Sequence, residues 1–163
     1  MQAITGLDGR SYTRQQLSTA LANGLRIQGY VWVNPGGSLA TTNARLSLFD
    51  GFPLEQIWAD VEEMNLTEAD VDRVLSACDA YLGNGRLAGI YSAPYVFVDN
   101  GWTHITKWAN AGRLLWVANY DHKADPDVNF TPFGGWSQCQ MKQHIGTTTV
   151  GSVTEIDLSA SRQ

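Results

Sequence analysis

Two acidic side chains, Asp60 and Glu62, follow the apolar run Ile57-Trp58-Ala59 and are separated by a single valine. Side chains alternate between the two faces of an extended strand, so both acids are expected to point the same way. Two residues of strand span roughly 6.6 Å, which holds both carboxyl groups within reach of one glycosidic bond. Such a pair favours one protonated and one ionised acid, which is the condition that sugar hydrolysis requires.

The same motif has an ordinary structural interpretation. An Asp-x-Glu sequence is short and common, and most examples are solvated residues of turns or helix starts. The elements that surround Asp60 and Glu62 must therefore distinguish a catalytic pair from a surface turn.

Strands and helices alternate over most of the chain. Strands are expected at residues 27–33, 56–62, 87–92, 114–120, 137–145 and 153–158. Helices are expected at residues 13–24, 38–49, 67–82 and 101–111, and residues 121–136 form a loop. The helix starts carry capping patterns, with Thr13 and Gln16 at one, Ser38 at the next, and Thr67 with Asp70 at the third. This alternation predicts an α/β fold with a parallel sheet covered by helices.

Both an open doubly wound sheet and a β/α barrel satisfy this pattern. Asn34-Pro35-Gly36-Gly37 follows the first long strand and matches neither of the glycine-rich phosphate loops, so a nucleotide site is not expected. Polar and aromatic residues gather at successive strand ends, as in the catalytic face of a barrel. These residues are Tyr30, Trp32, Asp60, Glu62, Tyr91, Ser92, Asn119, Tyr120 and Asp121, with Gln140, Gln143 and Asp157 on the last strands. For any single aromatic residue, core packing is the commoner outcome.

Composition limits the function classes. The length of 163 residues predicts one domain, residues 1–163. The net charge of −5 and the absence of a Lys/Arg cluster argue against nucleic acid or an anionic membrane as a partner. No apolar run is long enough to span a bilayer, and residues 1–6 do not begin a signal peptide.

The cysteines and histidines predict no cofactor and no metal. Cys78 is expected to be a buried hydrophobe and Cys139 to be half exposed, and nothing supports a disulfide between them. His122 lies near Asp121 and Asp125, but isolated loop histidines are usually solvated.

Five motifs in order resemble glycoside hydrolase family 25, the Chalaropsis-type lysozymes that include phage endolysins. They are Gly29-Tyr30-Val31-Trp32, Ile57-Trp58-Ala59-Asp60-Val61-Glu62, Gly89-Ile90-Tyr91-Ser92, Leu115-Trp116-Val117-Ala118-Asn119-Tyr120, and Gln143-His144 leading to Thr154-Glu155-Ile156-Asp157-Leu158. The resemblance extends over nearly the whole chain.

The resemblance implies cleavage of the β-1,4 bond between N-acetylmuramic acid and N-acetylglucosamine in peptidoglycan. It implies Glu62 as general acid, Asp60 as partner carboxylate and Asp157 as a further acid. Tyr30, Trp32, Tyr91, Trp116, Tyr120 and Gln143 are the expected substrate-binding residues. Such an enzyme acts on the cell wall if it is of the phage type or is exported by another route.

The sequence departs from the family at its start. Family members begin with a strand that bears an Asp, whereas Ala3-Ile4-Thr5-Gly6 resembles the end of the second strand. We therefore expect an incomplete (β/α) TIM-like barrel that lacks the first one or two strands. A homodimer or higher oligomer is expected to cover the exposed edges. The alternative function is a carbohydrate-binding or structural remnant of such a barrel that does not turn over.

Overall fold

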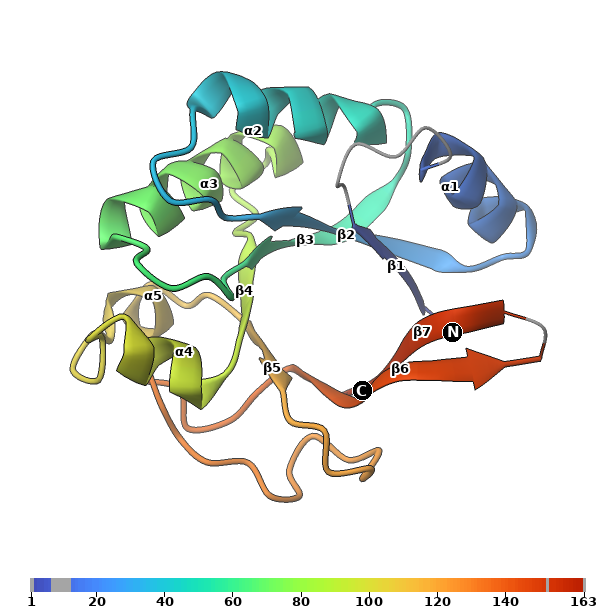
Figure 1. The fold of residues 1–163 in the computed structure, drawn as a ribbon. Helices are drawn as coiled ribbons and strands as arrows, with labels where there is room; N and C mark the ends of the chain where they lie inside the picture. Colours follow the sequence, from blue (N-terminus) through green and yellow to red (C-terminus); the bar gives the residue numbers. More distant parts are fainter. Residues whose placement is uncertain (1, 7–12, 152, 163) are drawn as a thin grey trace. The chain divides into compact units, whose positions relative to one another are not determined.

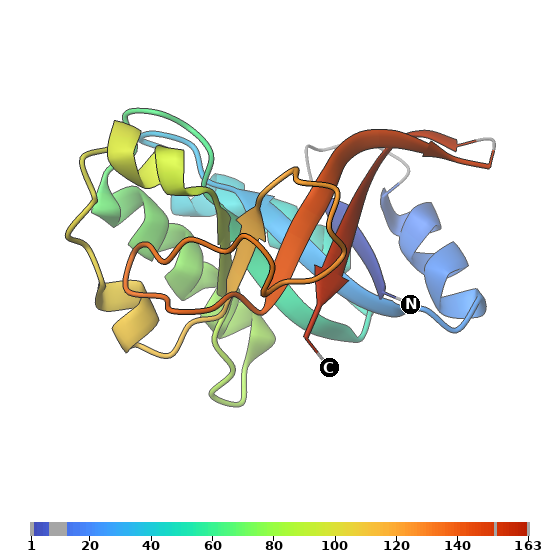
Figure 2. The same cartoon turned by 90° about the horizontal axis from the view of Figure 1, so that it is seen from below.

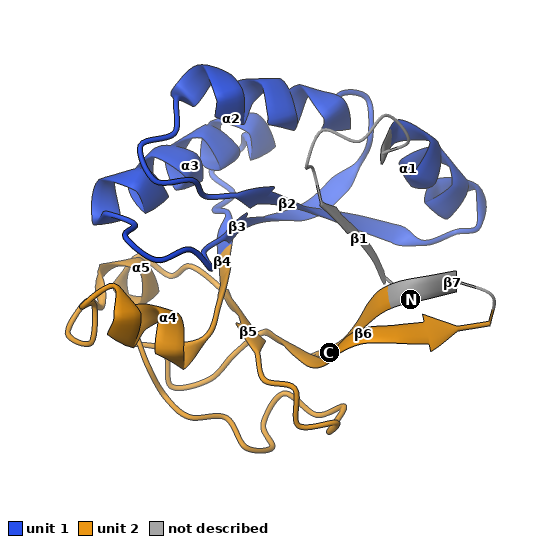
Figure 3. Cartoon of the chain, viewed as in Figure 1, with its two compact units in different colours: residues 1–89 blue, residues 90–163 orange. Residues whose placement is uncertain are grey.

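The computed structural model describes residues 2–6, 13–151 and 153–162. The chain divides into two compact units, residues 1–89 and residues 90–163 (Figure 3). The prediction of one domain over residues 1–163 stays a prediction.

The first unit is a run of alternating strands and helices. Its elements are β1 (Gln2–Gly6), α1 (Thr13–Ala22), β2 (Arg26–Trp32), α2 (Leu39–Leu46), the 3-10 helix η1 (Ser47–Phe49), β3 (Leu54–Asp60) and α3 (Glu68–Leu82). β2 pairs in parallel with β1 on one side and with β3 on the other. α2 and α3 lie side by side against β2 and β3 (Figure 1). The predicted α/β class and the alternation of an incomplete barrel are confirmed.

The helix starts follow the predicted caps. Ser38 precedes α2, and its Oγ accepts a hydrogen bond of 3.1 Å from the Thr41 N–H. Thr67 and Asp70 form a reciprocal capping box at the start of α3, where the Asp70 carboxylate accepts the Thr67 N–H at 3.0 Å. These bonds satisfy N–H groups that have no partner inside the helix, so local sequence determines where both helices begin. The side chain of Thr13, the other predicted cap, lies outside the described residues.

The two faces of β2 and β3 differ in chemistry. One face carries small and aliphatic residues: Ile27, Gly29 and Val31 on β2, with Ile57 and Ala59 on β3. These residues are buried, and the Phe49 ring of η1 packs directly on Gly29. The opposite face, here called the aromatic face, carries Gln28, Tyr30, Trp32, Gln56, Trp58 and Asp60. Parallel register places Trp32 beside Asp60 on it.

The second unit combines a parallel and an antiparallel arrangement. Its elements are β4 (Gly89–Ser92, with Gly89 the last residue of the first unit), α4 (Pro94–Asp99), α5 (Lys107–Asn110), β5 (Leu115–Ala118), β6 (Met141–Val150) and β7 (Val153–Ser161). β5 pairs in parallel with β4 and β6, and β6 pairs antiparallel with β7. The β6–β7 hairpin extends well beyond the parallel strands of this unit (Figure 2).

The prediction of a helix over residues 101–111 is wrong. Residues 101–106 are mainly turns, helix α5 covers only Lys107–Asn110, and the preceding helix α4 begins at Pro94. The Trp102 N–H donates to the Phe97 carbonyl at 2.7 Å and so closes the end of α4. The Phe97 ring then meets the rings of Trp102 and Trp108 edge-on, with centroids 5.7 and 5.9 Å away. Aromatic packing around Phe97 explains the apolar spacing that resembled a helix face.

The cysteines are buried free thiols. Cys78 lies in α3 as predicted, whereas the expectation that Cys139 is half exposed is wrong. Its Sγ donates to the Pro126 carbonyl at 3.3 Å, because the loop before β6 folds over it. Within the described part of the chain, no helix has the length and apolar character needed to cross a membrane.

We expect Gly29→Ala to destabilise the fold by about 1–3 kcal/mol, the usual cost of overpacking a core. A Cβ at position 29 would lie only 2.3 Å from the Cζ atom of Phe49. Denaturant unfolding of the single and double variants measures the cost. The smaller side chain of Phe49→Leu should reduce the penalty of the alanine. An equal penalty in both backgrounds would contradict the steric explanation.

Candidate functional site

The two acids of the Asp60–Glu62 pair meet, although they are not on one strand. β3 ends at Asp60 rather than at Glu62, which corrects the predicted strand of residues 56–62. Pairing with β2 stops there because β2 is followed by the turn at Asn34 and Pro35, and the last bond runs from the Val33 N–H to the Asp60 carbonyl at 2.9 Å. Glu62 lies two residues beyond, and its side chain shares a hydrogen bond with the Asp60 carboxyl.

Asp60 is a buried acid whose pKa is raised. Its side chain is only 4% exposed, and burial raises its pKa well above the ordinary value. Repulsion from Glu62, the shared hydrogen bond, and repulsion from Glu63 raise the pKa of Asp60 further. Among the described residues, none donates a hydrogen bond to its Oδ1. The two carboxyl groups therefore titrate as a pair that keeps one proton to a higher pH than a solvated acid does.

Two predicted binding residues of the first unit share the aromatic face with Asp60. Trp32 is its register partner, and Tyr30 is the partner of Trp58. Both Tyr30 and Trp32 are half-buried, so part of each ring is accessible. Deeper in this face, the Trp58 Nε1–H donates to the Gln28 Oε1 at 2.7 Å. The aromatic face thus presents accessible rings beside a buried carboxyl.

The predicted binding residues of the second unit form their own cluster. Tyr91 donates a short hydrogen bond to the Gln143 side chain, and its ring meets Trp116 with centroids 4.5 Å apart. The Tyr120 hydroxyl lies 3.5 Å from both the Tyr91 hydroxyl and the Gln143 Oε1. Its ring packs across Gly146, where a Cβ would approach it to 3.1 Å. Tyr120 is 54% exposed while the other three are buried, so it is the accessible ring of the cluster.

Asp157 lies apart from the acids of the first unit in sequence and is exposed on β7. Its Oδ1 accepts the Thr147 N–H at 2.7 Å across the hairpin. At this point Gly146 and Thr147 oppose Asp157 alone, and Thr147 has a φ of 52°. The carboxylate therefore supports a β-bulge.

The structure shows a buried lysine whose ion pair sequence analysis missed. Lys142 is fully buried on β6, and its Nζ contacts the Asp121 carboxylate at 3.2 Å and the Val128 carbonyl at 2.9 Å. Burial raises the pKa of Asp121, but hydrogen bonds from the Lys123 N–H, from Asn129 and from Lys142 outweigh it and lower the pKa below its ordinary value. The pair fastens the loop after Tyr120 to β6. A lysine within a predicted strand was the available clue.

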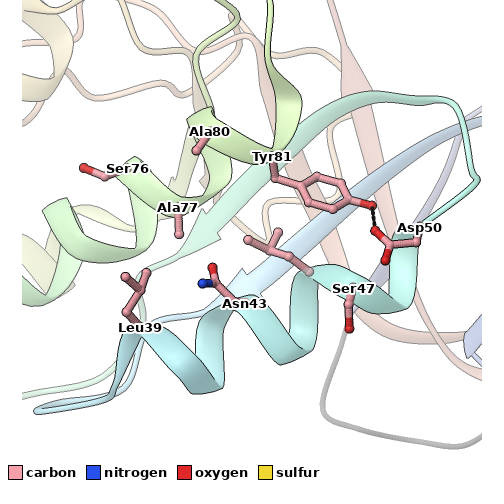
Figure 4. A pocket seen from close by; sticks show the side chains of 9 residues that line it. Leu39, Asn43, Ser47, Asp50, Ser76, Ala77, Ala80 and Tyr81 are labelled. Atoms are coloured by element: carbon pink, nitrogen blue, oxygen red, sulfur yellow. Dashed lines mark hydrogen bonds between the residues drawn. The ribbon is translucent and has the colours of Figure 1, made fainter.

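A cavity lies on the helix side of the first unit, and its lining does not include Asp60 or Glu62. It measures about 430 Å³ and lies between α2 and α3. Its polar end is formed by Tyr81, whose hydroxyl donates to the Asp50 carboxylate at 2.9 Å (Figure 4). The pKa of Tyr81 rises to about 12 because of burial and this bond. This cavity is separate from the aromatic face, since helices and Asp60 occupy opposite sides of β3.

Curated sequences and solved structures resemble this chain. No protein-family model matches the chain. Counting factor 50 of Dictyostelium discoideum is 34% identical over 118 residues, which are 67% of this chain and 36% of that protein. Probable GH family 25 lysozyme 3 of the same organism is 28% identical over 121 residues, or 70% of this chain and 24% of that protein. The chain thus spans 36% or less of the length of these curated relatives.

Solved structures show the same likeness at 13% identity. The spore cortex lytic enzyme SleM of Clostridium perfringens matches with a TM-score of 0.72 over 93% of this chain and 54% of its own. GHIP, a glycosyl hydrolase 25 of Streptococcus pneumoniae, matches with a TM-score of 0.70 over 99% of this chain and 76% of its own. This chain has the fold of glycoside hydrolase family 25. The catalytic domain of endolysin ply40 from a Listeria bacteriophage is similar too, with a TM-score of 0.69 and 80% of its length covered.

These findings confirm the resemblance to glycoside hydrolase family 25 that the five motifs indicated. They also confirm the predicted fold class, an incomplete TIM-like barrel. Because the identity to the solved structures is low, they establish the fold and leave the roles of individual side chains as proposals.

We expect Asp60→Asn to stabilise the protein increasingly as pH rises. The folded state keeps the Asp60 proton at pH values where the unfolded chain has lost it, since the pKa is raised on folding. The stability supplied by this group is therefore complete below about pH 4 and is lost as pH rises through the raised pKa. A tenfold change in acidity on folding corresponds to about 1.4 kcal/mol of stability, and asparagine removes this loss.

Melting temperatures measured from about pH 4 to pH 8 check this expectation. The control is Asp99→Asn, which replaces an exposed acid of α4 and gives the difference against which Asp60→Asn is compared. A constant difference for Asp60→Asn would contradict a raised pKa at this position.

Proposed function

We propose that this protein cleaves β-1,4 glycosidic bonds of peptidoglycan, with Glu62 as general acid and Asp60 as its partner carboxyl. One observation carries the proposal: a buried acid at the end of a parallel strand shares a hydrogen bond with a second, more accessible acid. The fold of glycoside hydrolase family 25 supports it.

The burial of the two acids supports a different proposed role for each. Glu62 is half-buried, whereas Asp60 is buried, so Glu62 is the carboxyl that a sugar substrate can reach. Protonation of the glycosidic oxygen by Glu62 allows the bond to the anomeric carbon to break, with positive charge developing on the sugar. The raised pKa of Asp60 keeps one proton on the pair, and the reactive form is the one in which Glu62 holds this proton and Asp60 is ionised. The proton passes from Glu62 to the glycosidic oxygen, and the Asp60 carboxylate supplies negative charge as positive charge develops on the sugar.

The contact between the two acids argues against Asp60 as a nucleophile on the opposite side of the sugar. Two catalytic carboxyls that flank a bond are about 5–5.5 Å apart in retaining enzymes and about 6.5–9.5 Å apart in inverting ones. Hydrogen-bonded carboxyls are closer than either. We therefore propose that Asp60 stabilises the oxocarbenium-like state or orients the acetamido group of the substrate, and that water completes hydrolysis.

Substrate binding is proposed for both sets of rings. Tyr30 and Trp32 have accessible ring area on the face that carries Asp60, and Tyr120 is the accessible ring of the Tyr91–Trp116–Gln143 cluster. Flat rings stack on the apolar faces of sugars. Buried Tyr91, Trp116 and Gln143 are proposed to act by holding Tyr120 in place. Asp157 as a further catalytic acid stays a prediction, since the contact described for it supports the bulge.

The alternative function is a protein that binds carbohydrate without hydrolysing it, and two observations favour it. Tyr91, Tyr120 and Gln143 contact one another, so this cluster can bind a ligand without the acid pair. The chain also spans only part of the length of its relatives. A homodimer or higher oligomer also stays a prediction, for which size measurement in solution is the direct test.

We expect Glu62→Gln to lower the rate of cell-wall hydrolysis by roughly 10²- to 10⁴-fold, the usual contribution of a general acid. Release of reducing sugars and loss of turbidity of purified peptidoglycan measure the rate. Melting temperature is measured as well, so that loss of the acid is distinguished from loss of the fold. The matched control is Glu55→Gln, an exposed acid at the other end of β3.

Three outcomes separate the candidate functions. Loss of activity in Glu62→Gln with retention in Glu55→Gln supports the proposed mechanism. Full activity of Glu62→Gln removes Glu62 as the acid. Binding of peptidoglycan fragments by a wild-type protein that does not hydrolyse them supports the binding alternative instead.

We expect Tyr120→Ala to raise KM for a soluble oligosaccharide by about 3- to 10-fold with little change in kcat, as loss of a stacking ring predicts. Tyr95→Ala is the control, because Tyr95 is an exposed tyrosine of α4 in the same unit. Equal KM values for both variants would remove Tyr120 from the binding site.

A further inference from the structure

A hydrogen-bond network joins the loop after β2 to both helices of the first unit. Arg45 of α2 donates from its Nη1 to the Trp32 carbonyl at 2.9 Å. With the Asn34 amide oriented so that its oxygen faces Arg45, that oxygen accepts bonds of 3.1 Å from both terminal nitrogens of the guanidinium. Arg73 of α3 in turn donates to the Asn34 backbone carbonyl at 3.4 Å.

Asp70 anchors the other end of this network. Its Oδ1 accepts the Gly36 N–H at 3.0 Å and the Arg73 Nη1 at 2.9 Å, while its Oδ2 accepts the Thr67 N–H and hydroxyl. Burial raises the pKa of Asp70, but these hydrogen bonds outweigh it and lower the pKa to about 2. Asp70 therefore serves as capping-box residue and as loop anchor, and it remains a charged group in the folded protein.

The loop after β2 holds both ends of the segment that carries Glu62. At one end, the Val33 N–H binds the Asp60 carbonyl, and Trp32 is the register partner of Asp60. At the other end, α3 begins at Glu68 and is tied by Asp70 to Gly36. Residues 61–66 therefore run between two points that are both held to the loop after β2. Trp32 is the link between this network and the aromatic face, because it is the register partner of Asp60.

We propose that Arg45 is a positioning residue of the Asp60–Glu62 pair, acting through the Trp32 carbonyl and the Asn34 side chain. The inference rests on the proposed function for its effect on catalysis, and on geometry alone for its effect on the pair. Arg45 keeps the β2–α2 loop closed onto the carboxyl end of β2, which holds Trp32 beside Asp60 and keeps Glu62 in contact with Asp60.

The test is Arg45→Met, which keeps the length of the side chain and removes its donors. Carbon-detected NMR titration of the Asp60 carboxyl reports the pair directly. Among the described residues, the charged groups that raise the pKa of Asp60 are Glu62 and Glu63, so separation of the pair lowers repulsion and removes the shared hydrogen bond. We expect the apparent pKa of Asp60 to fall toward the ordinary value. On soluble oligosaccharide, kcat should fall on the order of 10- to 100-fold with KM nearly unchanged.

Matched variants separate positioning from a general loss of structure. Arg45→Lys retains one donor and should restore part of both readouts. Arg26→Met removes an exposed arginine from the start of β2, where it pairs with Glu55, and should change neither. If Arg45→Met does not fold, Asn34→Ala removes the second partner of Arg45 and is read by the same two measurements.

The outcomes are distinct for the two proposals. If wild type does not hydrolyse the substrate, the proposed function fails and the carboxyl titration alone decides the role of Arg45. An unchanged Asp60 titration in folded Arg45→Met overturns the positioning role, whatever the activity. An equal change in Arg26→Met overturns it as well.

Discussion

The parallel pairing of β2 with β3 is the constraint on which the candidate site depends. Register places Trp32 beside Asp60 and ends the pairing at that point. On one side the strands pack closely against η1, so that the Phe49 ring fills the place of a Gly29 side chain. The other side carries Gln28, Tyr30, Trp58 and Asp60. A one-residue slip would exchange these two faces. The apolar packing against helices thus determines which face carries the acids.

Two buried acids of the first unit, Asp60 and Asp70, have pKa values that are shifted in opposite directions. Asp70 is buried and surrounded by donors, so its charge is stable and its pKa lies at about 2. Asp60 is buried with another acid as its neighbour, so its pKa is raised. A carboxylate with a lowered pKa and a carboxyl with a raised pKa are therefore a short distance apart in sequence. The difference arises from their partners, since both side chains are almost fully buried.

Much of the fold was predictable because its local determinants are strong. The caps at Ser38 and Thr67, the strand of residues 27–33 and the buried Cys78 were expected, and the structure confirms them. The failures lie where tertiary contacts replace local preferences. Residues 101–106 have helix-like apolar spacing, yet their tryptophan packs around Phe97. Lys142 gave only a weak indication of its role, because its partner Asp121 lies in a loop distant in sequence.

By itself, the sequence determined the α/β alternation, the helix starts and the presence of two acids separated by one residue, because these features depend on local chemistry. Tertiary structure decided that β3 stops at Asp60, that Glu62 nevertheless touches it, and that Asp157 supports a bulge. The physical reason is that strand length is set by the partner strand and pKa by burial and neighbours, and both belong to residues distant along the chain.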